Sequence, residues 1–141
     1  MSFTKALLLL LVGLAAIRSV RAQTYTVLYA FTGKADGNGP YGGLVRDSAG
    51  NLYGTTIGGG DGLYPNGTVF KLSSRGKLTP LHGFAADRTE GVWPFAGLVR
   101  DSVGNLYGMT ADGGTLGQGT VFKVGKKSKF SVLHSFSPAN R

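Results

Sequence analysis

Two blocks of this chain are almost the same sequence: GLVRDSAGNLYG at residues 43–54 and GLVRDSVGNLYG at residues 97–108, with eleven of twelve positions identical. A shorter block, GTVFK, follows each of them, at 67–71 and at 119–123. Self-similarity at a long, nearly constant period is typical of repeat proteins, in which one supersecondary unit is built more than once. The chain is therefore expected to fold as at least two copies of one structural unit.

An aromatic-ended segment opens each unit, and its three occurrences set the period. They read YTVLYAF at 25–31, LTPLHGF at 78–84 and FSVLHSF at 130–136, and they start 53 and then 52 residues apart. We accordingly divide the chain into a leader at 1–22, a first β unit at 23–77, a second β unit at 78–129 and the opening strand of a third unit at 130–141.

Each unit is predicted to consist of four short strands and no helix. In YTVLYAF the side chains alternate between two faces, which is the two-residue period of a β-strand. Short strands follow in the GLVRD, NLYGTT and GTVFK segments, separated by turns and a Gly-rich loop. Four strands in about 52 residues are typical of a propeller blade. We therefore expect an all-β fold of tandem four-stranded antiparallel repeats resembling β-propeller blades, with a sandwich, a barrel or a solenoid as alternatives.

Two units are too few for a closed propeller, which has about four to eight blades. The predicted architecture is an incomplete ring of two units plus one strand. Three explanations are open: the chain is a fragment of a longer reading frame, several copies assemble to complete a ring, or two sheets pack on each other with the last strand completing the second.

The acidic residue repeated in each turn is assigned a structural role. Asp47 and Gly50 stand at the first and fourth positions of a four-residue turn, and Asp101 and Gly104 repeat them. An Asp at this position accepts a hydrogen bond from a nearby backbone N–H, and Gly adopts the positive φ that closes the turn. A turn is needed once per repeat and a catalytic carboxylate is not. These four residues are therefore predicted to be turn residues.

The first 22 residues have the layout of a secretory signal peptide. Lys5 precedes an apolar run at 6–17, and Val20 and Ala22 lie where a signal peptidase reads small residues before the cut. The run is short for a membrane span, and a retained membrane anchor is the alternative. We expect a secreted or cell-envelope protein with no membrane span after cleavage.

The positive charge is weak support for nucleic-acid binding. The net charge of +8 includes Lys5, Arg18 and Arg21 of the leader, so it falls to +5 when the leader is removed. The densest basic cluster, within 126–129, lies between two predicted strands and is interpreted as a solvated turn. No nucleic-acid partner is expected.

No cofactor, metal site or catalytic residue is predicted. The chain has no cysteine, which excludes disulfides, thiolate metal ligands and a cysteine nucleophile. His82 and His134 occupy the same repeat position and are assigned to strand packing or a backbone hydrogen bond. Asp87, Arg88 and Glu90 share one loop and support the alternative of an extracytoplasmic hydrolase or lyase. The sequence favours a non-enzymatic role, or a truncated fragment with no role of its own.

Variation between the units is confined to loops, which indicates binding. The variable loops are 32–42, 57–66, 85–96 and 111–118. Tyr64 and Trp93 are loop aromatics that belong to one unit only, and such side chains can stack on sugars or peptides. We therefore predict a binding or structural module whose partner is an extracellular glycan or protein, with self-association to complete a propeller as a further expectation.

The blocks GLVRDSAGNLYGTT, GGGDGLYPNGTVFKL and LHGF resemble the repeats of the choice-of-anchor tandem repeat GloVer-containing proteins, a family of secreted bacterial proteins. The resemblance covers residues 25–136, which is essentially both units. Members of that family look like longer chains with many such units. The resemblance implies a β-propeller-like secreted or surface protein, and it implies no catalytic residue.

Overall fold

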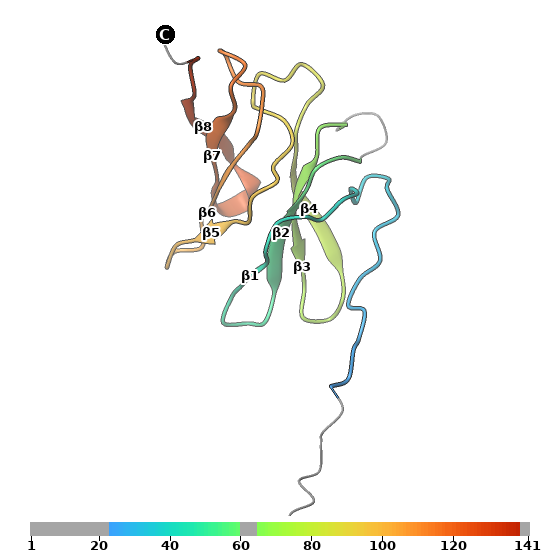
Figure 1. Cartoon of the computed structure of the whole chain (residues 1–141). Helices are drawn as coiled ribbons and strands as arrows, with labels where there is room; N and C mark the ends of the chain where they lie inside the picture. Colours follow the sequence, from blue (N-terminus) through green and yellow to red (C-terminus); the bar gives the residue numbers. More distant parts are fainter. Residues whose placement is uncertain (1–22, 60–64, 139–141) are drawn as a thin grey trace, which may run out of the picture.

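The computed structural model describes residues 23–59 and 65–138 (Figure 1). The predicted signal peptide and Tyr64 lie outside the described residues. Within these two ranges, no helix is long and apolar enough to cross a membrane. The regular structure of the described residues consists of eight strands and one 3-10 turn, η1, at Lys126–Ser128.

The strands form two antiparallel sheets, each a meander in which neighbours in sequence are neighbours in space. Sheet 1 contains β1 (Val45–Arg46), β2 (Leu52–Thr56), β3 (Thr68–Leu72) and β4 (Leu78–Gly83). Sheet 2 contains β5 (Val99–Arg100), β6 (Leu106–Met109), β7 (Thr120–Val124) and β8 (Phe130–Ser135). The predicted all-β fold of tandem four-stranded antiparallel repeats is confirmed. The sheets do not close into a barrel and are consistent with two blades of an incomplete propeller.

The two sheets are built with the same register. Leu52 pairs with Leu72 in sheet 1, and Leu106 pairs with Val124 in sheet 2. A bulge interrupts the pairing of the last two strands at the same place in β3 and β7. Because side chains alternate between faces along a strand, equal registers put equivalent residues of the two units on equivalent faces.

The expected strand order within each unit is wrong in one respect. The aromatic-ended segment closes a sheet instead of opening one, because it pairs with the GTVFK strand that precedes it in the chain. The segment at 78–84 therefore provides β4 of sheet 1, and the segment at 130–136 provides β8 of sheet 2 rather than the start of a third unit. Residues 25–31 follow no GTVFK block and form no strand. The boundaries of the sheets therefore differ from those of the sequence units at 23–77 and 78–129, because each sheet takes its last strand from the start of the following unit.

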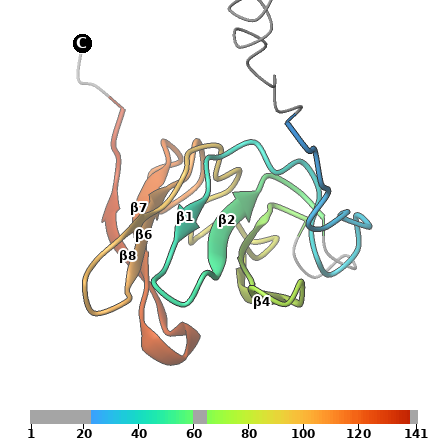
Figure 2. The same ribbon diagram turned by 90° about the horizontal axis from the view of Figure 1, so that it is seen from below.

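The two sheets pack on each other through an aromatic layer, and they lie side by side in both views (Figure 1 and Figure 2). Phe84 and Phe122 are completely buried, with their ring centroids 5.3 Å apart in an edge-to-face arrangement. His82 of β4 stacks on Phe130 of β8, with ring centroids 3.7 Å apart. Burying a phenylalanine side chain stabilises a fold by about 1.5–3 kcal/mol, so this layer is a main contribution to the contact. The buried core around it consists of Val69, Phe84, Leu98, Leu106, Phe122 and Val124.

Candidate functional site

The two repeated aspartates lie in the hairpin turns between the first two strands of each sheet. The Asp47 carboxylate accepts hydrogen bonds from the backbone N–H of Asn51 at 2.9 Å, the Asn51 side chain at 2.8 Å and the Tyr53 hydroxyl at 3.0 Å. Asp101 accepts the equivalent three bonds at 2.8, 2.7 and 3.1 Å. Gly50 and Gly104 close these turns with φ values of 81° and 95°. The carboxylates are thus engaged by their own hairpins.

These hydrogen bonds lower the pKa of both carboxylates. The Asn51 side chain, together with the Asn51 N–H and the Tyr53 hydroxyl, lowers the pKa of Asp47 from 3.8 to about 2. Desolvation by itself would raise the pKa of Asp101, but its hydrogen bonds outweigh that effect and lower it. A carboxylate with a lowered pKa in the folded state stabilises the protein above its unfolded pKa, and this stabilisation is lost as the pH falls through the folded value.

We therefore predict that stability falls between about pH 4 and pH 2, and that the fall is shallower in a variant carrying both Asp47→Asn and Asp101→Asn. Urea midpoints measured at intervals across this range test the prediction. Asp87→Asn is the control: among the described residues the Asp87 carboxylate accepts hydrogen bonds from Thr89 alone, two positions later, so this substitution should leave the contribution of both hairpin turns unchanged. Parallel profiles for wild type and double variant would show that the turns do not respond to acid.

The acidic and basic side chains of the loop at 85–96 are held by different partners. Arg88 donates to the Asp112 carboxylate at 2.7 Å, and Glu90 contacts His82 Nε2 at 3.0 Å. Burial lowers the pKa of His82, and the Glu90 carboxylate opposes this shift. Among the described residues, no group of three or more His, Asp or Glu side chains could hold a metal ion. The contacts of Arg88 and Glu90 tie the loop to its surroundings.

Trp93 has an unusual backbone conformation. Its φ of 57° lies in the left-handed region, where a bulky side chain costs roughly 1–2 kcal/mol. The equivalent residue of the first unit is Gly39, with a φ of 62°. Both residues precede a proline, and both accept a hydrogen bond from the N–H two positions later, that of Tyr41 or of Phe95. The second unit thus places a tryptophan at a position suited to glycine.

Three exposed aromatic side chains lie on the two equivalent loops that precede β1 and β5: Tyr41, Trp93 and Phe95, which we call the aromatic edge. Their exposed fractions are 71%, 40% and 48%. The Tyr41 and Phe95 rings lie 6.1 Å apart, and the Arg88 guanidinium lies 5.5 Å from the Trp93 ring centroid. Phe95 also lines a shallow cavity of about 260 Å³. The aromatic edge is therefore a surface that a ligand can reach.

Backbone hydrogen bonds hold the aromatic edge in place. The Trp93 N–H donates to the Asn66 carbonyl at 3.0 Å, and the Ala111 N–H donates to the Trp93 carbonyl at 3.2 Å. Pro94, between two of the exposed aromatic residues, is buried. Sequence reasoning selected Trp93 as a loop aromatic but missed its conformation. Aligning the two loops on their shared proline would have matched Trp93 with a glycine.

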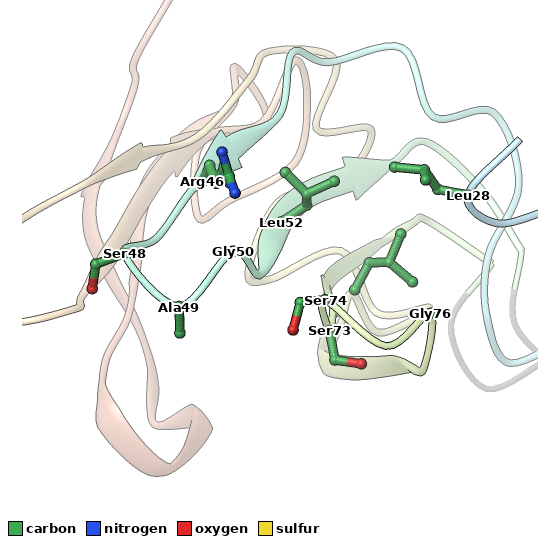
Figure 3. Close-up of a pocket in the computed structure, with 10 residues that line it drawn as sticks. Leu28, Arg46, Ser48, Ala49, Gly50, Leu52, Ser73, Ser74 and Gly76 are labelled. Carbon is green, nitrogen blue, oxygen red and sulfur yellow. The ribbon is translucent and has the colours of Figure 1, made fainter. Parts of the chain in front are cut away.

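A cavity of about 360 Å³ lies at the opposite end of sheet 1, next to its two hairpin turns (Figure 3). Its lining includes Leu28, Arg46, Gly50 and Ser73. In Figure 3, Leu28 and Ser48 lie at opposite sides of the cavity. Sequence reasoning did not find it, because the lining comes from three segments that are separated along the chain.

Comparison with known proteins agrees with the repeat architecture. No curated protein and no solved structure matches the chain. The model of one family, described as the Gloeobacter/Verrucomicrobia repeat, matches residues 16–141, which include both copies of every repeated block. The match confirms the resemblance to GloVer repeat proteins: the chain belongs to the Gloeobacter/Verrucomicrobia repeat family.

Proposed function

We propose that this protein is secreted and acts as a binding module whose aromatic edge contacts an extracellular glycan. The observation that carries the proposal is the left-handed conformation of Trp93, the chain's single tryptophan, where the first unit has Gly39. For folding alone, glycine is the better residue at such a position. Strained residues of this kind are concentrated at functional sites, so we infer that Trp93 serves a ligand.

The chemistry of the aromatic edge suits a sugar. A pyranose ring has an apolar C–H face that stacks on an aromatic ring, and its hydroxyl groups then need polar partners close by. Arg88 and Asp112 lie beside Trp93 and are paired with each other at 2.7 Å. This pair supplies a donor and an acceptor without net charge, which favours a neutral glycan over an anionic one.

The shared scaffold with its variable loops, and the leader, support a binding role outside the cytoplasm. The two sheets share one register, while the loops at 32–42 and 85–96 differ in length and composition. Binding residues are commonly carried on loops that a rigid scaffold positions. The leader at 1–22, with its apolar run and small residues before Gln23, supports export of this scaffold.

Trp93→Gly, which introduces the residue of the first unit, is predicted to separate binding from folding. We expect affinity for a neutral polysaccharide to fall by about 30-fold, which corresponds to the ~2 kcal/mol of a binding hot spot. The free energy of unfolding should change by no more than about 1 kcal/mol, because relief of backbone strain offsets the lost packing. Titration calorimetry with cello-, xylo- and chito-oligosaccharides measures the first quantity, and urea unfolding measures the second.

Val103→Ala is the matched control, because it also gives the second unit the residue that the first unit has, Ala49. This residue lies in a hairpin turn at the other end of the sheet, away from the aromatic edge. The variant should bind as the wild type does. If the wild type binds no sugar but retains a protein partner, the ligand of the aromatic edge is a protein and not a glycan. A Trp93→Gly variant with wild-type affinity would remove the aromatic edge from the proposal.

A further inference from the structure

The contact between the two sheets is asymmetric, and each sheet contributes a different face to it. Sheet 1 contributes what we call its trailing face, on which Tyr53 and Phe84 lie. Sheet 2 contributes its leading face, on which Arg100 and Phe122 lie. The Phe84 and Phe122 rings pack edge to face at 5.3 Å, and the Arg100 guanidinium lies 5.8 Å from the Tyr53 ring centroid.

Each sheet also carries the face that the other one uses, because the two registers are the same. The edges of these second copies are far more exposed. Leu44 on the leading face of sheet 1 is 54% exposed, whereas its equivalent Leu98 is 5% exposed. Phe136 on the trailing face of sheet 2 is 39% exposed, whereas its equivalent Phe84 is completely buried. The open leading face comprises Leu44, Arg46, Leu52, Phe70 and Leu72, and the open trailing face comprises Tyr107, Val121, Lys123, Leu133 and Phe136. At the centre of the open leading face, Phe70 and Leu72 are 3% and 6% exposed.

The cavity of Figure 3 shows what the open leading face lacks. A smaller cavity of about 200 Å³ occupies the same repeat position between the two sheets. The equivalent lining pairs are Leu28 and Leu81, Gly50 and Gly104, Leu52 and Leu106, and Leu72 and Val124. Tyr53 and Lys71 of a trailing face also line the smaller cavity, and no trailing-face residue is among the described residues that line the larger one. The larger cavity thus has the leading-face side of the contact between the sheets and lacks the trailing-face side.

The open trailing face holds its side chains as the occupied one does. The Tyr107 hydroxyl donates to Asp101 at 3.1 Å, as the Tyr53 hydroxyl donates to Asp47 at 3.0 Å. The Lys123 ammonium lies 5.7 Å from the Tyr107 ring centroid, and the corresponding distance in sheet 1 is 5.8 Å. No rearrangement of these side chains is needed before this face binds a leading face.

Residues 25–31 lie over the centre of the open leading face, where Phe70 and Leu72 are buried, and leave its edge at Leu44 exposed. Phe31 packs edge to face on Phe70 with ring centroids 5.2 Å apart, which repeats the contact of Phe84 with Phe122. The segment forms no strand, and Tyr25 in it is 90% exposed. A complete strand can therefore displace residues 25–31 from this face.

We propose that two copies of this chain bind head to tail, with the trailing face of sheet 2 of one copy on the leading face of sheet 1 of the next. Phe136 of the incoming copy takes the place of Phe31 on Phe70, and Arg46 takes a position over the incoming Tyr107. Such a heterologous contact closes into a ring when its rotation permits. Since each copy supplies two sheets, a ring of about four to eight blades needs about two to four copies.

The mass of the 141-residue chain in solution, measured by light scattering and sedimentation velocity over a range of concentrations, tests this proposal. We expect about two to four copies per particle. Leu44→Asp removes the leading face and Leu133→Asp removes the trailing face, and each side chain is more than half exposed, so folding should be kept. Each variant alone should be monomeric, and an equimolar mixture should form a dimer that does not grow. Leu116→Asp, equally exposed but in the loop at 111–118, should assemble as the wild type does.

A heterodimer on mixing is the signature of two different complementary faces, which neither misfolding nor non-specific association produces. A wild-type chain that stays monomeric at every concentration overturns the proposal. So does an assembly whose mass is unchanged in Leu44→Asp or Leu133→Asp, and so does a mixture of the two folded variants that remains monomeric. Circular dichroism establishes that both variants are folded. None of these outcomes depends on glycan binding.

Discussion

Phe84→Ala is expected to lower the free energy of unfolding by about 3–5 kcal/mol, which is a large share of the ~5–15 kcal/mol that holds a domain of this size. The Phe84 ring is completely buried and contacts Phe122, Phe130 and His82, so its removal leaves a cavity at the centre of the contact between the sheets. Urea unfolding followed by circular dichroism measures the change.

Phe136→Ala is the matched control for this prediction. Phe136 stands at the same repeat position in sheet 2, but it is 39% exposed, and its truncation should cost less than about 1 kcal/mol in the isolated monomer. The contrast between two chemically identical substitutions isolates the effect of the second sheet. Equal losses at the two positions would mean that the sheets are stable separately and do not depend on this contact.

Gly119→Ala is expected to destabilise the fold by roughly 2–4 kcal/mol, because strain and steric overlap act together. Gly119 has a φ of 92°, and an added Cβ would collide with the Thr110 carbonyl oxygen on the neighbouring strand segment. Gly67 makes the equivalent approach to the Thr56 carbonyl oxygen with a φ of 105°. The same requirement therefore recurs where β3 and β7 begin. Thermal and urea unfolding of the two alanine variants measure the cost.

Gly76→Ala separates backbone strain from overlap. Gly76 also has a positive φ, 80°, but nothing lies within 4 Å of an added Cβ, so only about 1 kcal/mol of strain is expected. If Gly76→Ala were as damaging as Gly119→Ala, the close approach of the two strands at Gly119 would not be the cause.

The candidate site was only partly predictable. The repeated blocks mark the positions that both units share, so Trp93 was recognisable as a residue of one unit. Its left-handed backbone was not apparent from the second unit alone, although the offset of 54 positions that relates Gly43 to Gly97 also places Trp93 opposite Gly39. The partner aromatic residues of the edge, Tyr41 and Phe95, come from loops more than fifty residues apart, and only the packing of the two units brings them together.

Strand pairing shows the same limit. The segments at 25–31 and 78–84 both carry an aromatic-ended pattern, yet one lies across a sheet face and the other is β4. A pattern along one strand reports which side chains share a face, and it does not report which strand supplies the hydrogen bonds. Whether a face is open depends on what packs against it, so the open faces of sheet 1 and sheet 2 are a property of the tertiary structure.

The repeated blocks, the two-residue alternation and the spacing of Asp and Gly were enough to predict that the chain is all-β, that it contains two equivalent units and that Asp47 and Asp101 stand in turns. Identical blocks adopt identical local structure, and the conformations of Asp and Gly in turns depend on their immediate neighbours. The folded chain was needed to see where each sheet begins, which faces are covered and which side chains meet at the aromatic edge. Those features depend on contacts between residues far apart in the chain, and no local pattern encodes them.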